Sequence, residues 1–141
     1  MHAPQLKSVM TPFPYSVDVG APVSEALEFM REHKIRHLPV MERGNLKGVI
    51  SDRDINLALG PDFAYPDAHE LKVRDAMIED CYVVDLNTPL HAVLRHLAEQ
   101  RLGSALVTRR GKLAGVFTLT DACRAFADYL EGSPVDEDDA A

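Results

Sequence analysis

The chain repeats itself at a fixed offset, and this repeat constrains its fold more than any other feature of the sequence. Shifting the sequence by 67 positions aligns residues 10–54 with residues 77–121 without a gap, and 14 of the 45 aligned positions are identical. Such self-similarity indicates two consecutive copies of one structural unit. Because a unit of about 55 residues is marginally stable alone, we expect the copies to pack together as an intramolecular pair.

Each copy begins with the pattern of a short strand followed by a helix. Apolar residues alternate over 15–19 and again over 82–86, which is typical of a strand. Pro22 and Pro89 then stand where proline fits the first turn of a helix, with Thr88 as the expected cap in copy two. Apolar residues at helical spacing follow both prolines.

The second half of each copy has the pattern of a hairpin followed by another helix. The runs 38–41 and 46–50 flank a turn that contains Gly44, and copy two repeats this arrangement around Gly111. A helix is expected to start near Ser51 and near Thr118. The sequence therefore predicts an α+β fold of two pseudo-symmetric β-α-β-β-α repeats.

The repeat also sets the expected domain boundaries. Copy one covers 6–59, a linker rich in Pro, Asp and Ala covers 60–71, and copy two covers 72–130. An acidic tail over 131–141 carries five acidic residues and no basic one, so we expect it to be disordered. Since the whole chain has a net charge of -7, residues 1–130 carry only -7 + 5 = -2.

This charge distribution and the composition exclude several classes of protein. A nearly neutral body without a basic stripe argues against nucleic acid as the main partner. No apolar run reaches the roughly 18 residues of a membrane span, and the first residues do not resemble a signal peptide, so we expect a cytoplasmic protein with no membrane partner. Cys81 and Cys123 are too few for a disulfide scaffold and are interpreted as reduced packing residues.

The passage from the last strand into the second helix is the most informative stretch of each copy. GVISDRD over 48–54, here the first junction, and GVFTLTD over 115–121, the second junction, share the pattern G-h-h-[ST]-x-x-D, where h is apolar. A helix N-terminus presents free N–H groups and partial positive charge to a phosphate. The Asp carboxylate can accept two hydrogen bonds, which suits the cis hydroxyls of a ribose. Together these groups favour a nucleotide.

A purely structural interpretation of the junctions stays open beside this one. The pattern S/T-x-x-D before an apolar run is also a capping box, in which the two side chains satisfy only their own helix. The glycine three residues before the hydroxyl can let a ligand approach the backbone, but it also suits crowded strand packing. Recurrence of the whole pattern in both copies favours the ligand.

The body of the chain, roughly 6–130, resembles a tandem pair of CBS (cystathionine beta-synthase) domains. The segments that carry the resemblance are VMTP (9–12), APVSEALEFM (21–30), IRHLPVMERGNLKGVISDRDI (35–55), VRDAM (73–77) and TPLHAVLRHLAEQRLGSALVTRRGKLAGVFTLTDA (88–122). CBS domains are regulatory modules that sense adenosine-containing ligands. The resemblance implies a pseudo-two-fold pair with a cleft between the copies, and commonly a homodimer of two such pairs.

The same resemblance implies particular site residues. The hydroxyl of each junction contacts phosphate and the carboxylate holds ribose, which assigns these roles to Ser51 with Asp54 and to Thr118 with Asp121. In copy one, Arg36 and His37 are candidates for the phosphate side, Leu38 and Pro39 for an adenine wall, and Thr11 for a further contact. Copy two has Gly103, Ser104, Ala105 and Leu106 at the positions of 36–39, and Ile78 at that of Thr11. The copy-one site is therefore expected to be the better equipped.

No pattern in the chain favours catalysis or a metal. The six histidines lack a coherent ligand spacing, and the sequence contains no GxSxG, Walker A or Rossmann fingerprint. We therefore expect a non-enzymatic sensor that binds AMP, ADP or ATP in the cleft between the copies, requires no metal, and signals through its dimer or an unidentified partner protein. The alternative is a ligand-free dimerisation or interaction scaffold of the same fold.

Overall fold

The computed structural model describes residues 3–12, 14–60 and 69–132, and these form two compact units that do not follow the order of the repeat. One unit is continuous and covers 13–82. The other combines 1–12 with 83–141, so the start of the chain belongs with the second copy. Each packing unit therefore combines the main part of one sequence repeat with the first segment of the other repeat. Of the expected acidic tail, 131–141, Glu131 is the last residue of α6, and residues 133–141 lie outside the described residues, as do 61–68 of the expected linker.

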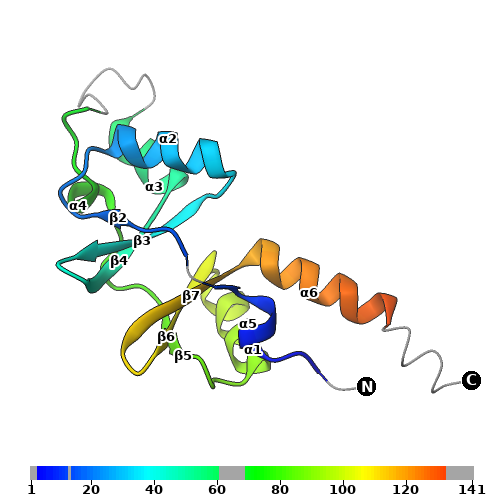
Figure 1. Cartoon of the computed structure of the whole chain (residues 1–141). Helices are drawn as coiled ribbons and strands as arrows, with labels where there is room; N and C mark the ends of the chain where they lie inside the picture. Colours follow the sequence, from blue (N-terminus) through cyan, green and yellow to red (C-terminus); the bar gives the residue numbers. More distant parts are fainter. Residues whose placement is uncertain (1–2, 13, 61–68, 133–141) are drawn as a thin grey trace, which may run out of the picture. The chain divides into compact units, whose positions relative to one another are not determined.

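The continuous unit, 13–82, is a three-stranded sheet with helices (Figure 1). Its sheet has the order β2-β3-β4, in which β2 runs parallel to β3 and β3 antiparallel to β4. The elements in chain order are β2 (Val17–Asp18), α2 (Val23–His33), β3 (His37–Glu42), β4 (Asn45–Ser51), α3 (Asp52–Leu59) and α4 (Val73–Ala76). The predicted order of strand, helix, strand, strand and helix is confirmed, and α4 is an additional element.

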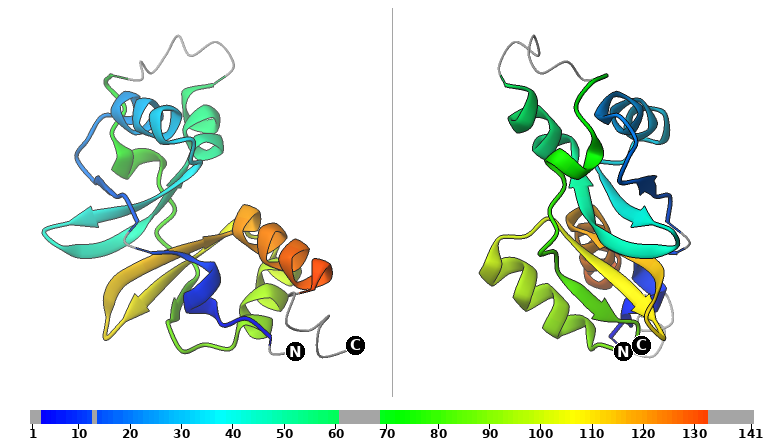
Figure 2. Two further views of the ribbon diagram at one scale, coloured as in Figure 1. Left: turned by 45° about the vertical axis from the view of Figure 1, so that its right-hand side comes forward. Right: turned by 90° about the vertical axis from the view of Figure 1, so that its left-hand side faces the viewer.

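The split unit repeats this arrangement and adds an edge strand to its sheet. Its sheet has the order β1-β7-β6-β5, with β5 parallel to β6 and both β6–β7 and β1–β7 antiparallel. The elements in chain order are α1 (Leu6–Val9), β1 (Thr11–Pro12), β5 (Val83–Asp85), α5 (Leu90–Gln100), β6 (Ser104–Arg109), β7 (Lys112–Thr118) and α6 (Leu119–Glu131). Figure 2 shows the long β6–β7 hairpin beside α5, α6 and α1.

The two hairpins turn at the predicted glycines. Arg43 and Gly44 have φ values of 53° and 80°, and Arg110 and Gly111 have 53° and 78°. Positive φ at both central positions is the geometry of a type I′ hairpin turn, and glycine adopts it without steric cost. The β3–β4 and β6–β7 hairpins therefore follow from local sequence.

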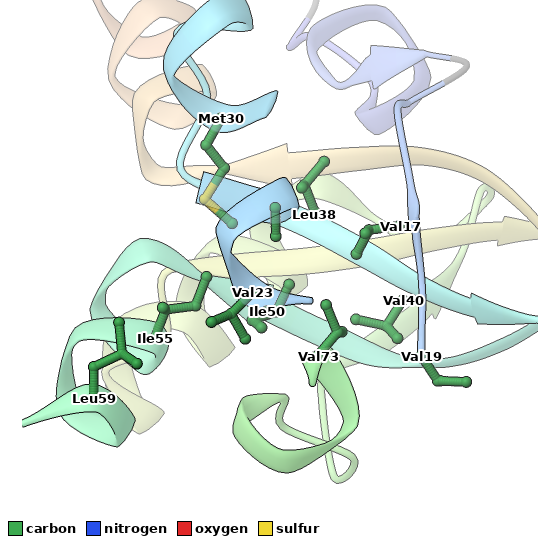
Figure 3. Packing of buried hydrophobic residues seen from close by; sticks show 11 residues of the cluster. Val17, Val19, Val23, Met30, Leu38, Val40, Ile50, Ile55, Leu59 and Val73 are labelled. Carbon is green, nitrogen blue, oxygen red and sulfur yellow. The ribbon is translucent and has the colours of Figure 1, made fainter. Parts of the chain in front are cut away.

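The core of the 13–82 unit lies between its sheet and its helices (Figure 3). It is built from residues of β2–β4, α2 and α3, together with Val73 of α4, which belongs to the start of copy two. Val73 is fully buried, which contributes about 1.5–3 kcal/mol by hydrophobic transfer. Leu6, the equivalent residue of copy one, is buried in the other unit, where α1 contacts α6.

Three local predictions need correction. The first strand is shorter than expected, because Tyr15 lies outside β2 and its ring packs against Phe29 and His33 at centroid distances of 5.0 and 4.2 Å. Pro22 and Pro89 are the N-cap residues of α2 and α5, both with non-helical backbone angles, so neither occupies the first helical turn. Thr88 therefore precedes the cap and does not form it.

Candidate functional site

Both junctions form closed capping boxes at the starts of α3 and α6. The Ser51 hydroxyl accepts from the Asp54 backbone N–H at 3.1 Å, and the Asp54 carboxylate accepts from the Ser51 N–H at 2.9 Å. At the second junction the corresponding distances between Thr118 and Asp121 are 3.3 and 3.0 Å. The predicted helix starts and their caps are confirmed. Any ligand must therefore use groups that the caps leave available.

The glycine of each junction accommodates backbone from the first segment of the other copy. A Cβ on Gly48 would overlap the carbonyl group of Ile78, which bridges to Val49. A Cβ on Gly115 would lie 2.5 Å from the Met10 sulfur and 2.9 Å from the Thr11 carbonyl oxygen. Crowded strand packing therefore accounts for these glycines, and close approach of a ligand is not needed to explain them.

The first junction brings together polar residues from β3, β4 and α3. His37 pairs with Ser51 across the β3–β4 ladder, and the Asp52 N–H donates to the Arg36 carbonyl oxygen at 3.2 Å. The Arg36 side chain is 82% exposed, with its Nε 3.9 Å from an Asp52 carboxylate oxygen. An exposed ion pair of this length is weak. The Arg36 guanidinium can therefore turn to an anion at low cost.

His37 does not add a cation to this cluster at neutral pH. Burial lowers the pKa of its imidazole below the usual 6.5, and nearby Arg36 lowers it further, while Asp52 and Asp54 act in the opposite direction. The desolvation cost of the charged form is the largest of these effects. The neutral imidazole retains one donor and one acceptor for hydrogen bonding.

Two predicted wall residues are buried. Leu38 is fully buried within the core cluster of its unit, so its side chain already packs against apolar neighbours. Pro39 is buried as well. Neither side chain therefore presents a large exposed surface to an adenine ring in this structure.

Thr11 lies at the second junction, which corrects its expected grouping with copy one. Its strand β1 pairs with β7, and its hydroxyl lies 3.4 Å from each carboxylate oxygen of Asp121. Ile78 takes the equivalent place beside Val49 at the first junction. The reason is that the first segment of each copy packs in the unit formed by the rest of the other copy. The sequence pattern of one copy alone does not indicate this exchange.

The carboxylate of Asp121 is already engaged on both oxygens. The residue is only 6% exposed, and Oδ2 accepts from the Thr118 hydroxyl as well as from its N–H. Arg124, which sequence reasoning missed, places Nη1 3.3 Å from Oδ1. Its position three residues after Asp121 was the available signal, since residues at this spacing meet on a helix surface.

The carboxylate of Asp54 is engaged on one oxygen. Oδ2 accepts from Ser51, and among the described residues no side chain donates to Asp54. The residue three positions on is Leu57, which is 73% exposed and offers no charge. Asp54 is half-buried, so it is less enclosed than Asp121, which is buried.

Other candidate groups do not assemble into a site. Within 3–12, 14–60 and 69–132, no three His, Cys, Asp or Glu side chains are placed to hold a metal ion. Cys81 is half-buried, but Cys123 is exposed, so the interpretation of Cys123 as a packing residue is wrong. None of the described helices is long and apolar enough to cross a membrane.

Comparison with known proteins gives a consistent family. The CBS domain model matches residues 6–60 and 73–128. A zinc metalloprotease of Methanocaldococcus jannaschii is 34% identical over 121 residues, which cover 86% of this chain but only 32% of that protein. The chain thus spans about a third of that relative's length.

Two solved structures resemble the whole fold. CBSX2 in complex with AMP is 31% identical with a TM-score of 0.73, over 87% of this chain and 96% of that one. A structure described as a putative acetoin utilization protein from Vibrio cholerae has a TM-score of 0.80 at 23% identity, over 92% and 95% of the two chains. At that identity, the second likeness concerns the fold alone.

Proposed function

Because the chain belongs to the CBS domain family, we propose that this regulatory module binds an adenosine nucleotide, AMP, ADP or ATP, at its first junction. The observation that carries the proposal is the half-buried Asp54 carboxylate, which has one oxygen engaged in the cap of α3 and lies two residues from Asp52, the ion-pair partner of the exposed Arg36 guanidinium. This arrangement offers a hydrogen-bond acceptor and an anion-binding group side by side. A phosphorylated sugar requires both.

Each group at the first junction has a distinct role in the proposed complex. The Ser51 oxygen accepts from the Asp54 N–H and keeps its own O–H to donate to a phosphate oxygen. The N–H groups of Asp52 and Arg53 already donate to the Arg36 carbonyl oxygen and to Asp52 Oδ1, so a phosphate at the start of α3 competes with these bonds. Arg36 adds a planar fork of donors suited to phosphate oxygens. Asp54 accepts from a ribose hydroxyl, and neutral His37 contributes a hydrogen bond.

The second junction is the weaker site in this proposal. Thr118 and Asp121 retain the motif, but Thr11 and Arg124 occupy the carboxylate that a ribose would need. Gly103 and Ser104 stand where copy one has its arginine and histidine. A nucleotide there must displace internal contacts, which lowers its net affinity.

The choice of an adenosine ligand is supported by the relative whose solved structure contains AMP. We propose that binding stabilises one arrangement of the protein through its differential affinity for that arrangement. The module itself carries out no catalysis, acts in the cytoplasm, and passes its occupancy to a partner protein whose identity is open.

A ligand-free scaffold is the second candidate function, and one observation favours it. Throughout the described residues, no fully buried side-chain nitrogen or oxygen lacks a hydrogen-bond partner. The caps satisfy the junctions internally, so folding requires no ligand. A scaffold predicts that unfolding midpoints do not respond to nucleotide, because only ligands that bind the native state raise them.

Calorimetric titration of the full chain with AMP, ADP and ATP tests the proposal. We expect binding of at least one nucleotide, and at least about a tenfold loss of affinity in Asp54→Ala, since one charged hydrogen bond contributes about 1.5–3 kcal/mol. Asp75→Ala is the matched control, because Asp75 caps α4 in the same unit through the Lys72 N–H at 3.1 Å. Absence of heat at millimolar ligand, or equal effects of both variants, contradicts the proposal.

A further inference from the structure

The aspartate that begins α3 occupies groups that a phosphate at the first junction would use. Asp52 Oδ1 accepts from the Arg53 backbone N–H at 2.8 Å, and Asp52 Oδ2 lies 3.9 Å from Arg36 Nε. The Asp52 side chain is 40% exposed, so it lies at the surface of the unit and not in its core. Asp52 is therefore an internal anion beside the guanidinium that we assign to the phosphate.

The ion pair between Arg36 and Asp52 has no counterpart in copy two. The equivalent positions hold Gly103 and Leu119, so both charges are missing together. In both copies the backbone N–H of the second residue donates to the carbonyl oxygen of the first at 3.2 Å. The local fold therefore does not require the ion pair. Because an exposed pair also adds little stability, stability does not explain its presence in copy one.

The charges around the first junction suit an anion of low charge. Three charged groups act on the half-buried imidazole of His37: the carboxylates of Asp52 and Asp54 and the guanidinium of Arg36. Arg53 is exposed and is not among them. One positive and two negative charges leave a net charge of -1, to which the neutral imidazole adds nothing. A single cation beside two carboxylates can balance one phosphate better than a chain of phosphates.

We propose that Asp52 is a specificity-determining residue, which makes the first junction favour a nucleoside monophosphate over di- and triphosphates. This inference rests on the proposed function and names the ligand class of the same site. One phosphate draws the Arg36 guanidinium away from Asp52, whose carboxylate stays bonded to the Arg53 N–H. Each further phosphate adds negative charge within the roughly 8 Å over which charges act at physiological ionic strength. Asp52 repels this charge, so the affinity falls with each added phosphate.

Calorimetric titration of the full chain with AMP and with metal-free ATP tests the role of Asp52. We expect the wild type to bind AMP at least about fivefold more tightly than ATP. Asp52→Asn should lower this ratio of affinities about fivefold, in line with an exposed charge interaction of up to about 1 kcal/mol. The asparagine keeps an oxygen that accepts from the Arg53 N–H, so the substitution removes the charge and retains the hydrogen bond.

A matched control and a second variant separate charge from structure. Asp75→Asn removes one charge from the first turn of α4 in the same unit, and it should leave the ratio of affinities unchanged. Circular dichroism checks that each variant folds. Asp52→Leu, which copies the residue of copy two, replaces Asp52→Asn if the latter does not fold. Higher ionic strength screens exposed charges, so it should shrink the ratio of the wild type toward that of Asp52→Asn.

The possible outcomes distinguish this inference from the proposed function. A ratio that is the same in the wild type and in the Asp52 variants contradicts only the role of Asp52. A ratio that ignores salt, an equal change in Asp75→Asn, or tighter binding of ATP than of AMP by the wild type does so as well. Absence of binding by both nucleotides, in the wild type and in Asp52→Asn, contradicts the proposed function and this inference with it.

Discussion

The two junctions share a sequence motif and a cap, yet the structure gives their carboxylates different surroundings. Asp54 is half-buried and has one oxygen engaged, whereas Asp121 is buried and is held by Thr118, Thr11 and Arg124. Two residues outside the motif create this contrast. Arg124 contacts Asp121, whereas the equivalent residue after Asp54 is Leu57. Thr11, from the start of the chain, also contacts Asp121. A motif therefore identifies the helix start, and its neighbours decide what the carboxylate can bind.

The largest expected difference between the two junctions concerns their glycines, which pack against the exchanged first segments. We expect Gly48→Ala to lower the free energy of unfolding by about 3 kcal/mol, the upper range for overpacking, because the new Cβ meets the Ile78 backbone. Gly115→Ala should cost less, since its nearest neighbour is the flexible Met10 side chain. Urea unfolding measures both values. Equal losses would show that the two exchanged segments pack alike.

Removal of each carboxylate should have unequal effects on stability. Asp121→Ala is expected to lower the free energy of unfolding by about 2–3 kcal/mol, because it removes a buried charged acceptor and leaves its donors unpaired. Asp54→Ala removes a helix cap and should cost about 1 kcal/mol. Thermal unfolding of both variants without ligand provides the comparison. The contrast drawn here is wrong if Asp54→Ala is the more destabilised.

Substitutions at Leu57 and Arg124, which follow Asp54 and Asp121 by three residues, test whether a neighbouring cation competes with the ligand for the carboxylate. Leu57→Arg gives Asp54 the neighbour that Asp121 has, and we expect it to weaken nucleotide binding about fivefold, in line with an exposed ion pair of up to about 1 kcal/mol. Arg124→Leu removes the charged donor to Oδ1 of Asp121, leaves only the Thr11 hydroxyl at that oxygen, and should strengthen binding at the second junction. Calorimetry measures both effects, and a tighter Leu57→Arg complex would refute the competition argument.

The smallest expected effect is the pH dependence of the first junction. Because the pKa of His37 is lowered in the folded protein, the unfolded chain takes up this proton first as the pH falls. Stability contributed by His37 is thus present above pH 6.5 and is lost as the pH falls from 6.5 toward the lowered value. NMR titration of the imidazole should give a pKa below 6.5, and His37→Gln should flatten the decline. A raised pKa contradicts this.

Local patterns were sufficient to predict part of the fold and of the site. The turns at Gly44 and Gly111 and the caps at Ser51 and Thr118 depend on residues within a few positions of each other, so the sequence predicts them directly. The prediction that Thr88 caps α5 was wrong, because Pro89 is the N-cap residue.

The rest of the site depends on contacts between distant parts of the chain. Thr11 meets Asp121 across 110 residues of sequence, and no pattern within one copy specifies that its first segment packs in the other unit. Burial of Leu38 in the core likewise depends on helices that surround it. The binding roles of the junction residues remain predictions.

Amide chemical shifts during titration with AMP test the central claim most directly. If the first junction binds the nucleotide, the amide signals of residues 51–54 shift first and saturate, together with that of His37, while those of 118–121 follow only at higher concentration. Shifts confined to 118–121, or none at millimolar AMP, ADP or ATP, would contradict it.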